Sequence, residues 1–315
     1  MDSHEKQRTI KNEARFSGKA LQTGARVELR CLPSQEGTGV VFRRVDIKGR
    51  PEVPVNPKYI SSSKLRRSAL KRGKAEVQTT EHFLAALWAL GIDNILVEID
   101  ASELPAMDGS AAAFMAGLEK AGIQEQDARR RVLRVRRTHF VKGKNGSITV
   151  SPADKFSVSY RIDYPLRSIG RETMKFDLDR EVFAREIAPA RTFCMKKEAM
   201  MLLKIGLGKG ADLENTLVMD DDGPMGTKMR FPNEPLRHKI MDLVGDLYML
   251  GVPLQARVEA VRSGHTLNAA LIRQLYGDYM VRTEERRENT SGMEGFLLKV
   301  LSIFRTMKKG EQDGK

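Results

Sequence analysis

The chain has 315 residues, of which 41% are hydrophobic and 30% charged, as in a soluble protein with room for about two domains. Its apolar runs fall far short of the ~20 residues that a membrane span needs, and its polar N-terminus predicts no signal peptide. Its two cysteines exclude a disulfide scaffold and favour a reducing cytosol. The 54 basic and 41 acidic residues give a net charge of +13, which suits nucleic acid, an anionic membrane or a phosphorylated substrate.

The first half of the sequence reads as strands followed by two helices. The strands are expected at roughly residues 8–16, 26–32 and 39–45. A loop-rich basic segment, about 46–78, precedes an apolar helix over 81–91 that ends at Gly91, a typical helix-stop residue. A strand over 92–100 and a second apolar helix over 111–121 complete this half.

The second half repeats the same order of elements. Its strands are expected at roughly residues 133–141, 147–151, 156–163 and 172–177. A segment of about 187–222, helical near 196–204, does not fit the repeat. A helix over 238–251, a strand over 252–262 and a final helix over 265–275 follow.

This repeated order predicts an α+β fold rather than a doubly wound sheet, because runs of strands precede runs of helices. We expect two similar domains, each a β-sheet with two helices on one face, and the apolar helices should pack together between the two sheets. The expected domains are residues 1–128 and 132–281, joined at 129–131, with a first insert at about 46–78, a second insert at about 187–222 and a basic C-terminal tail at 282–315.

His238 and Asp242 are four residues apart on a predicted helix, so both side chains lie on one face. Such a pair can hold a cation, although an isolated pair is more often a surface feature. Glu81 and His82 open the equivalent helix of the first half. If the helices pack together, His82 would face His238 and Asp242, and two imidazoles plus one carboxylate would leave a fourth position for water, as in catalytic zinc sites. Glu81 could then be the base for that water.

His265 begins the final helix, where the helix N-terminus disfavours an imidazolium. A protonated His265 needs a nearby carboxylate, and Asp246, one turn beyond Asp242, is the candidate. The alternative is a capping or core histidine. His4 and His139 have no comparable setting and are assigned no role.

These motifs together resemble the LpxC family, the UDP-3-O-acyl-N-acetylglucosamine deacetylases. The matching segments are TEH at 80–82, LGIDN at 90–94, LPAMDGSA at 104–111, ARTF at 190–193, DDDG at 220–223, RHKIMD at 237–242, GDL at 245–247 and SGHTLN at 263–268. They follow the family's order from about residue 18 to residue 275. Together they are very unlikely by chance.

The resemblance implies a cytoplasmic, monomeric zinc amidase that acts on UDP-3-O-acyl-GlcNAc in lipid A biosynthesis. By the matching motifs, Zn²⁺ would be held by His82, His238 and Asp242. The implied catalytic roles are general base for Glu81, general acid for His265, oxyanion stabilisation for Thr192 and pairing with His265 for Asp246. Lys239 and Phe193 would contact substrate, with Lys239 serving the diphosphate, and the second insert would form the acyl passage.

One residue departs from the family pattern. The family has Leu-His-Thr-Gly or Leu-His-Ser-Gly near its start, whereas this sequence reads LQTG at 21–24. Gln22 can form hydrogen bonds but cannot titrate near neutral pH. We therefore interpret Gln22 as a substrate contact at the mouth of the site, and expect activity to persist because the ligands and acid–base residues are present.

Two alternative functions remain open at this point. Gln22 is compatible with a paralogue that deacetylates another acylated or nucleotide sugar. The net charge and the basic clusters at 64–74 and 129–137 are compatible with a nucleic-acid-binding protein. The basic runs lack interleaved aromatic residues, and no recognised nucleic-acid motif appears, so we expect no nucleic-acid partner.

The tail predicts a basic amphipathic helix over residues 295–310, with about 14 residues between its bracketing glycines. It is too short to span a bilayer but could lie in the headgroup region of an anionic membrane. This would place the protein at the inner face of the membrane. The alternative is a helix packed on the protein's own body or on a partner chain.

Overall fold

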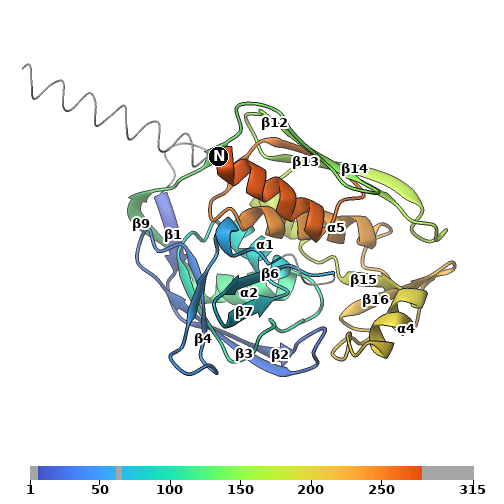
Figure 1. The fold of residues 1–315 in the computed structure, drawn as a ribbon, viewed down its shortest axis with the longest axis horizontal. Coiled ribbons are helices and arrows are strands. Elements are labelled where there is room, and N and C mark those ends of the chain that lie inside the picture. Colours follow the sequence, from blue (N-terminus) through green and yellow to red (C-terminus); the bar gives the residue numbers. More distant parts are fainter. Residues whose placement is uncertain (1–5, 62–65, 279–315) are drawn as a thin grey trace, which may run out of the picture. The chain divides into compact units, whose positions relative to one another are not determined.

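The computed structural model describes residues 6–61 and 66–278 (Figure 1). Residues up to 273 form one compact unit, and residues from 274 onward belong to another, of which the helical residues 274–278 are described. The helix predicted at 295–310 lies outside the described residues. Within the part that is described, no helix is long and apolar enough to cross a membrane.

A five-stranded sheet forms the framework of the first half. Its strands, in spatial order, are β2 (Ala14–Lys19), β3 (Arg26–Pro33), β8 (Ile95–Ile99), β4 (Val40–Arg44) and β5 (Glu52–Pro54). β4 and β8 are parallel and the other pairs are antiparallel. Alternate residues of β3 are buried because successive side chains of a strand point to opposite faces. The sheet therefore presents one apolar face to the helices.

The second half contains a sheet with the same pairing order. Its strands are β11 (His139–Lys142), β12 (Ser147–Ser151), β19 (Arg257–Val261), β13 (Ser157–Asp163) and β14 (Arg171–Asp177). β13 and β19 are parallel, and the remaining pairs are antiparallel. The two sheets thus match strand for strand, as the repeated order in the sequence predicted.

Helices occupy the space between the two sheets (Figure 1). α1 (Glu81–Leu90) packs against α5 (Glu234–Tyr248) and against α2 (Ala112–Ala121). Every residue of α1 is buried, because sheet and helices cover all of its sides. Aromatic rings link the layers: Phe42 of β4 contacts Phe83 of α1, which in turn contacts Phe114 of α2. The predicted α+β class is confirmed. The domain boundaries stay a prediction.

The remaining elements include both inserts. In the first insert, η1 (Pro57–Tyr59) precedes the hairpin of β6 (Ala69–Arg72) and β7 (Ala75–Gln78). Around and within the second insert lie α3 (Arg180–Val182), η2 (Phe183–Ile187), β15 (Thr192–Met195), α4 (Lys196–Lys204), β16 (Thr216–Asp220) and β17 (Gly223–Pro224). The helix predicted near 196–204 coincides with α4.

Three predicted strands are each divided in two. β1 (Lys6–Ile10) pairs with β9 (Ile123–Arg129), whereas β2, which follows it, joins the first sheet. In the same way β10 (Leu133–Arg134) pairs with β18 (Leu254–Gln255), while their successors β11 and β19 belong to the second sheet. The chain changes partners at each break, which an unbroken apolar pattern in the sequence does not reveal.

Gly245 lets α5 approach α1 closely. A Cβ atom at this position would lie 1.9 Å from the carbonyl oxygen of Glu81, and the obstacle is backbone that cannot rotate away. We therefore expect Gly245→Ala to lower the free energy of unfolding by at least the roughly 1–3 kcal/mol typical of overpacking, as measured by urea denaturation. Gly277 is a helical glycine, and no atom of the described residues lies within 4 Å of where its Cβ would be, so Gly277→Ala is the matched control and should be neutral or mildly stabilising. An unchanged midpoint for Gly245→Ala would contradict this account of the helix contact.

Candidate metal and acid–base site

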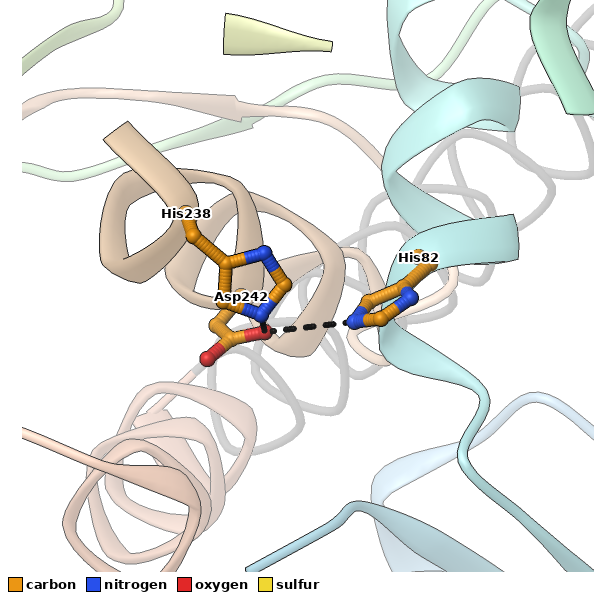
Figure 2. Close-up of side chains that lie close together, drawn as sticks. All are labelled: His82, His238 and Asp242. Atoms are coloured by element: carbon orange, nitrogen blue, oxygen red, sulfur yellow. Dashed lines mark ion pairs between the residues drawn. The ribbon is translucent and has the colours of Figure 1, made fainter. Parts of the chain in front are cut away.

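Two histidines and one aspartate converge between α1 and α5 (Figure 2). His82 is the second residue of α1, and His238 and Asp242 lie one turn apart on α5. Asp242 Oδ1 is 3.3 Å from His238 Nε2 and 3.7 Å from His82 Nε2. One ligand atom from each residue lies within 4.8 Å of the other two. Helix packing has therefore brought together three residues that are up to 160 positions apart in the chain.

Neighbouring groups fix the orientation of these side chains. The Nδ1–H of His238 donates to the Ala190 carbonyl oxygen at 3.1 Å, so Nε2 is the nitrogen that faces Asp242. The Phe193 ring stands edge-on to the His238 ring, with centroids 6.2 Å apart. Lys239 Nζ donates to Asp242 Oδ2 at 2.7 Å, which leaves Oδ1 for the two imidazoles.

The protonation states of the group suit a divalent metal. All three side chains are buried. Burial lowers the pKa of His82, because it disfavours the cationic imidazole. Burial alone would raise the pKa of Asp242, but the Lys239 ammonium and His238 hold that pKa well below its usual value. A neutral His82 and an ionised Asp242 are the forms that bind metal. Two imidazoles and a carboxylate fit zinc.

Glu81 and His265 border this group on one side. Glu81 Oε1 lies 3.8 Å from His265 Nε2, and that nitrogen lies 3.9 Å from Asp242 Oδ2. Burial raises the pKa of Glu81 to about 8, although His265 acts against the shift. Burial alone would lower the pKa of His265, but the carboxylates of Asp246 and Glu81 raise it to about 9. A carboxylate and an imidazole with shifted pKa values thus lie side by side next to the candidate ligands.

Asp246 is a fully buried carboxylate that holds His265 in place. The Nδ1–H of His265 donates to Asp246 Oδ2 at 2.9 Å, which directs Nε2 toward Glu81. Asn268 Nδ2 donates to the same oxygen at 2.8 Å, and the Ser68 hydroxyl donates to Oδ1. Three donors satisfy this buried charge, so its position is well determined.

Ser68 is a site residue that the sequence analysis missed. Besides its bond to Asp246, its Oγ lies 3.1 Å from His265 Nδ1. Its backbone N–H donates to Glu81 Oε2 at 3.2 Å. Ser68 therefore contacts both acid–base residues at once. It directly precedes β6 of the first insert, where no periodic pattern or motif indicated a role.

A cavity of about 900 Å³ opens over the site. The predicted substrate residues Gln22, Phe193 and Lys239 line it, and so does Thr192, the predicted oxyanion residue. The basic residues Arg66, Arg67, Lys142, Lys144 and Arg262 line it too. Apolar side chains of the second insert form another part of its wall: Ala199, Leu202, Leu203, Leu213 and Val218. The cavity therefore combines a basic region with an apolar one.

Comparison with known proteins shows the family of the chain. The sequence model of LpxC, described as UDP-3-O-acyl N-acetylglycosamine deacetylase, matches residues 7–277. The chain belongs to the LpxC family. A protein of Chromobacterium violaceum called UDP-3-O-acyl-N-acetylglucosamine deacetylase is 37% identical over 272 residues, which are 85% of this chain and 90% of the relative. A protein of the same name from Thioalkalivibrio sulfidiphilus is 38% identical over 273 residues, 86% of this chain and 90% of the relative.

Two predicted substrate residues of this LpxC chain are already engaged by protein groups. The ammonium of Lys239 is bound to Asp242, and that carboxylate raises the pKa of Lys239 despite the opposing effect of burial. Gln22 Oε1 accepts a hydrogen bond from the Gly208 N–H at 3.2 Å, so it links the start of the chain to the second insert. The backbone N–H of Gln22 is held by the buried carboxylate of Glu103 at 2.9 Å.

We expect Gln22→His to alter KM more than kcat. Gln22 lines the cavity and contacts Gly208, whereas no acid–base residue is bonded to it. Changing it should therefore alter substrate binding and leave the chemical step nearly unchanged. Steady-state kinetics with the acylated nucleotide sugar would measure both constants. A large rise in kcat at constant KM would show instead that Gln22 limits the chemistry.

Proposed function

We propose that this chain is a zinc-dependent hydrolase that removes the N-acetyl group from UDP-3-O-acyl-N-acetylglucosamine, releasing acetate and the free amine in lipid A biosynthesis. One observation carries the proposal: a buried His82–His238–Asp242 group lies in contact with an acid–base pair, Glu81 and His265, at the base of one cavity. Membership of the LpxC family and the names of two relatives support the choice of reaction.

His82, His238 and Asp242 are the residues that would hold the zinc. When bound there, the metal supplies Lewis-acid chemistry, which polarises a carbonyl group and makes water more acidic. The bond from His238 to Ala190 and the bond from Lys239 to Asp242 keep the ligand atoms oriented before the metal arrives.

Glu81 and His265 would divide the proton transfers. Amide hydrolysis needs a base to take a proton from the attacking water and an acid to protonate the departing amine. Glu81 would take the first proton in its ionised form, which its raised pKa of about 8 makes a stronger base than an ordinary carboxylate. His265, kept protonated by Asp246, is suited to the second at Nε2. The hydroxyl of Thr192, which lines the cavity, would donate to the oxyanion that forms at the former carbonyl oxygen.

The cavity offers a matching environment for each end of the substrate. Basic side chains on its wall suit the UDP diphosphate. Lys239 is paired with Asp242 and Arg66 with Glu198, so Lys142 and Lys144 are the better candidates for that task. The apolar residues of the second insert suit the acyl chain, which gains by leaving water. The same chemistry supports a cytoplasmic site of action, where nucleotide sugars are made.

The decisive experiment offers purified, zinc-analysed protein two substrates, acylated and non-acylated UDP-GlcNAc, and measures acetate release. The proposal expects turnover of the acylated sugar and about one zinc per chain. Efficient turnover of another sugar alone would favour a paralogue that deacetylates that sugar, the alternative suggested by Gln22. Metal-free protein that retains nucleic acid through purification would favour the binding protein.

We expect Asp246→Asn to shift the alkaline limb of the pH–rate profile to lower pH. Activity through His265 is lost as the pH rises through its pKa, because only the protonated imidazole can donate. Burial lowers that pKa, but the carboxylates of Asp246 and Glu81 together raise it to about 9, so a neutral amide at position 246 lets His265 deprotonate at lower pH. The readout is kcat/KM against pH, with Asp127→Asn as the control, because Asp127 is an exposed carboxylate on β9 that pairs with Lys6 and does not line the cavity. An alkaline limb that does not move would exclude His265 as its source.

A further inference from the structure

Large exposed hydrophobic side chains are concentrated on one element. Among residues 6–61 and 66–278, seven such side chains are exposed, and six of them lie between positions 200 and 225. Met200, Met201, Leu203 and Ile205 follow closely on one another and are 57%, 53%, 61% and 59% exposed. Together with the exposed Lys197 and Lys204 we call them the α4 surface. Leaving four large apolar side chains exposed within six positions is costly for a surface that only meets water.

The inner side of α4 is fully engaged with the rest of the second insert and with the first insert. Leu202 is buried, and Glu198, one turn earlier, forms an ion pair with Arg66 at 2.6 Å. Because residues three and four apart share a helix face, Met200 lies with Lys196, Lys197 and Lys204 on the opposite, outward side. Of these lysines, Lys196 is paired with Asp220 at 2.9 Å.

The outward charges of the α4 surface are cationic. Within the part of the chain that is described, neither Lys197 nor Lys204 forms an ion pair. Both carry flexible stems that place an ammonium beside the exposed methionines. In Figure 1, α4 lies with β15 and β16 at the lower right, to one side of the two five-stranded sheets.

The α4 surface is continuous with the apolar wall of the cavity. Leu203 belongs to both, since it is 61% exposed and also lines the cavity. Ala199 and Leu202, on the inner side of the helix, line the cavity behind it. The apolar wall therefore reaches the outside of the molecule at α4.

We propose that the α4 surface docks on an anionic lipid bilayer. The methionines, Leu203 and Ile205 would enter the boundary between headgroups and acyl chains, while Lys197 and Lys204 would meet anionic headgroups. A lipid surface explains the combination better than a protein partner, because lysine is depleted from the centres of protein interfaces but favoured where a bilayer carries negative charge. The net charge of +13 also attracts the whole chain to an anionic bilayer at long range.

This inference goes beyond the proposed function and does not depend on it, because lipid binding requires no turnover. If both hold, the apolar part of the cavity opens at the lipid surface. An acylated nucleotide could then keep its chain in an apolar environment on the way into the cavity.

The test is co-sedimentation of the full chain with large unilamellar vesicles, either phosphatidylcholine alone or a 7:3 mixture with phosphatidylglycerol. We expect binding to the anionic vesicles that weakens in high salt. Met200→Gln combined with Met201→Gln should weaken it roughly tenfold through lost apolar burial. Lys197→Gln combined with Lys204→Gln should weaken it about fivefold per lysine and remove much of the preference for anionic lipid.

Two matched controls distinguish vesicle binding through the α4 surface from non-specific hydrophobic adsorption. Met200→Leu with Met201→Leu keeps the apolar area and should bind like the unmodified chain. Phe140→Gln removes another exposed apolar residue, on β11, and should also leave binding unchanged. The proposal is overturned if the glutamine variants bind as the unmodified chain does, which would assign binding to another segment such as 295–310. It is overturned equally if no vesicle binding occurs and the methionine variants instead convert an oligomer to a monomer.

Discussion

Asp242→Ala and His238→Ala should each remove the zinc from the purified protein and abolish turnover with it. Either change leaves only two protein ligands, whereas catalytic zinc sites use three and a water. The two remaining residues cannot replace the missing ligand, because each of the three residues already contributes one atom to the group within 4.8 Å. Metal content per chain, measured by inductively coupled plasma mass spectrometry after mild chelation, gives a readout that does not depend on activity.

Asp246→Asn is the matched control for this experiment. Asp246 is a buried carboxylate on the same helix, one turn beyond Asp242, but its partners are Ser68, His265 and Asn268. It should therefore retain zinc. Because Asp242→Ala also leaves the buried Lys239 without its partner, circular dichroism must show that the variant is folded before its metal content is interpreted. Unchanged metal in both ligand variants would show that the ligands have been assigned wrongly.

Glu81→Gln and His265→Ala should keep the zinc but lose turnover by roughly 10²–10⁴-fold, the usual cost of removing a general base or acid. Both residues touch the ligand group without belonging to it: Glu81 adjoins His82 in sequence, and His265 Nε2 lies 3.9 Å from Asp242. Glutamine keeps the shape of Glu81 and can still accept the N–H of Ser68, so the loss would report the missing base.

A split between kcat and KM tests whether these residues act in the chemical step. If Glu81 and His265 move protons, kcat falls and KM changes little. A variant with near-normal kcat removes that residue from the mechanism. Raised KM with normal kcat in His265→Ala would indicate a binding residue. Zinc analysis of the same samples separates these outcomes from simple loss of metal.

Helical spacing explains why the central part of the site was predictable. His238 and Asp242 lie on one face because they are four residues apart, and His82 was placed by the expectation that apolar helices pack together. The close contact of Asp246 with His265 followed from the need of an imidazolium for a carboxylate. These inferences use local geometry or burial, both of which are encoded in the amino-acid pattern.

Loop positions were not predictable in the same way. Ser68 reaches Glu81 and Asp246 only because the first insert folds over α1, and nothing near Ser68 in the sequence signals that path. The contact of Gln22 with Gly208 joins residues 186 positions apart through two loops. Divided strands such as β1 and β2 were missed because pairing partners, rather than residue type, decide where one strand ends.

The candidate metal ligands come from both halves of the chain, so metal binding and folding would be linked. His82 comes from α1 and His238 and Asp242 come from α5, so neither half can bind the metal with three ligands on its own. A ligand that binds only the assembled state stabilises that state by mass action, in proportion to the logarithm of its concentration over its dissociation constant. A metal bound by these three residues would act as a non-covalent cross-link between the two helices, at the contact that Gly245 makes possible. Under the proposed function, the supply of metal would then set the resistance of the α1–α5 contact to unfolding as well as the activity.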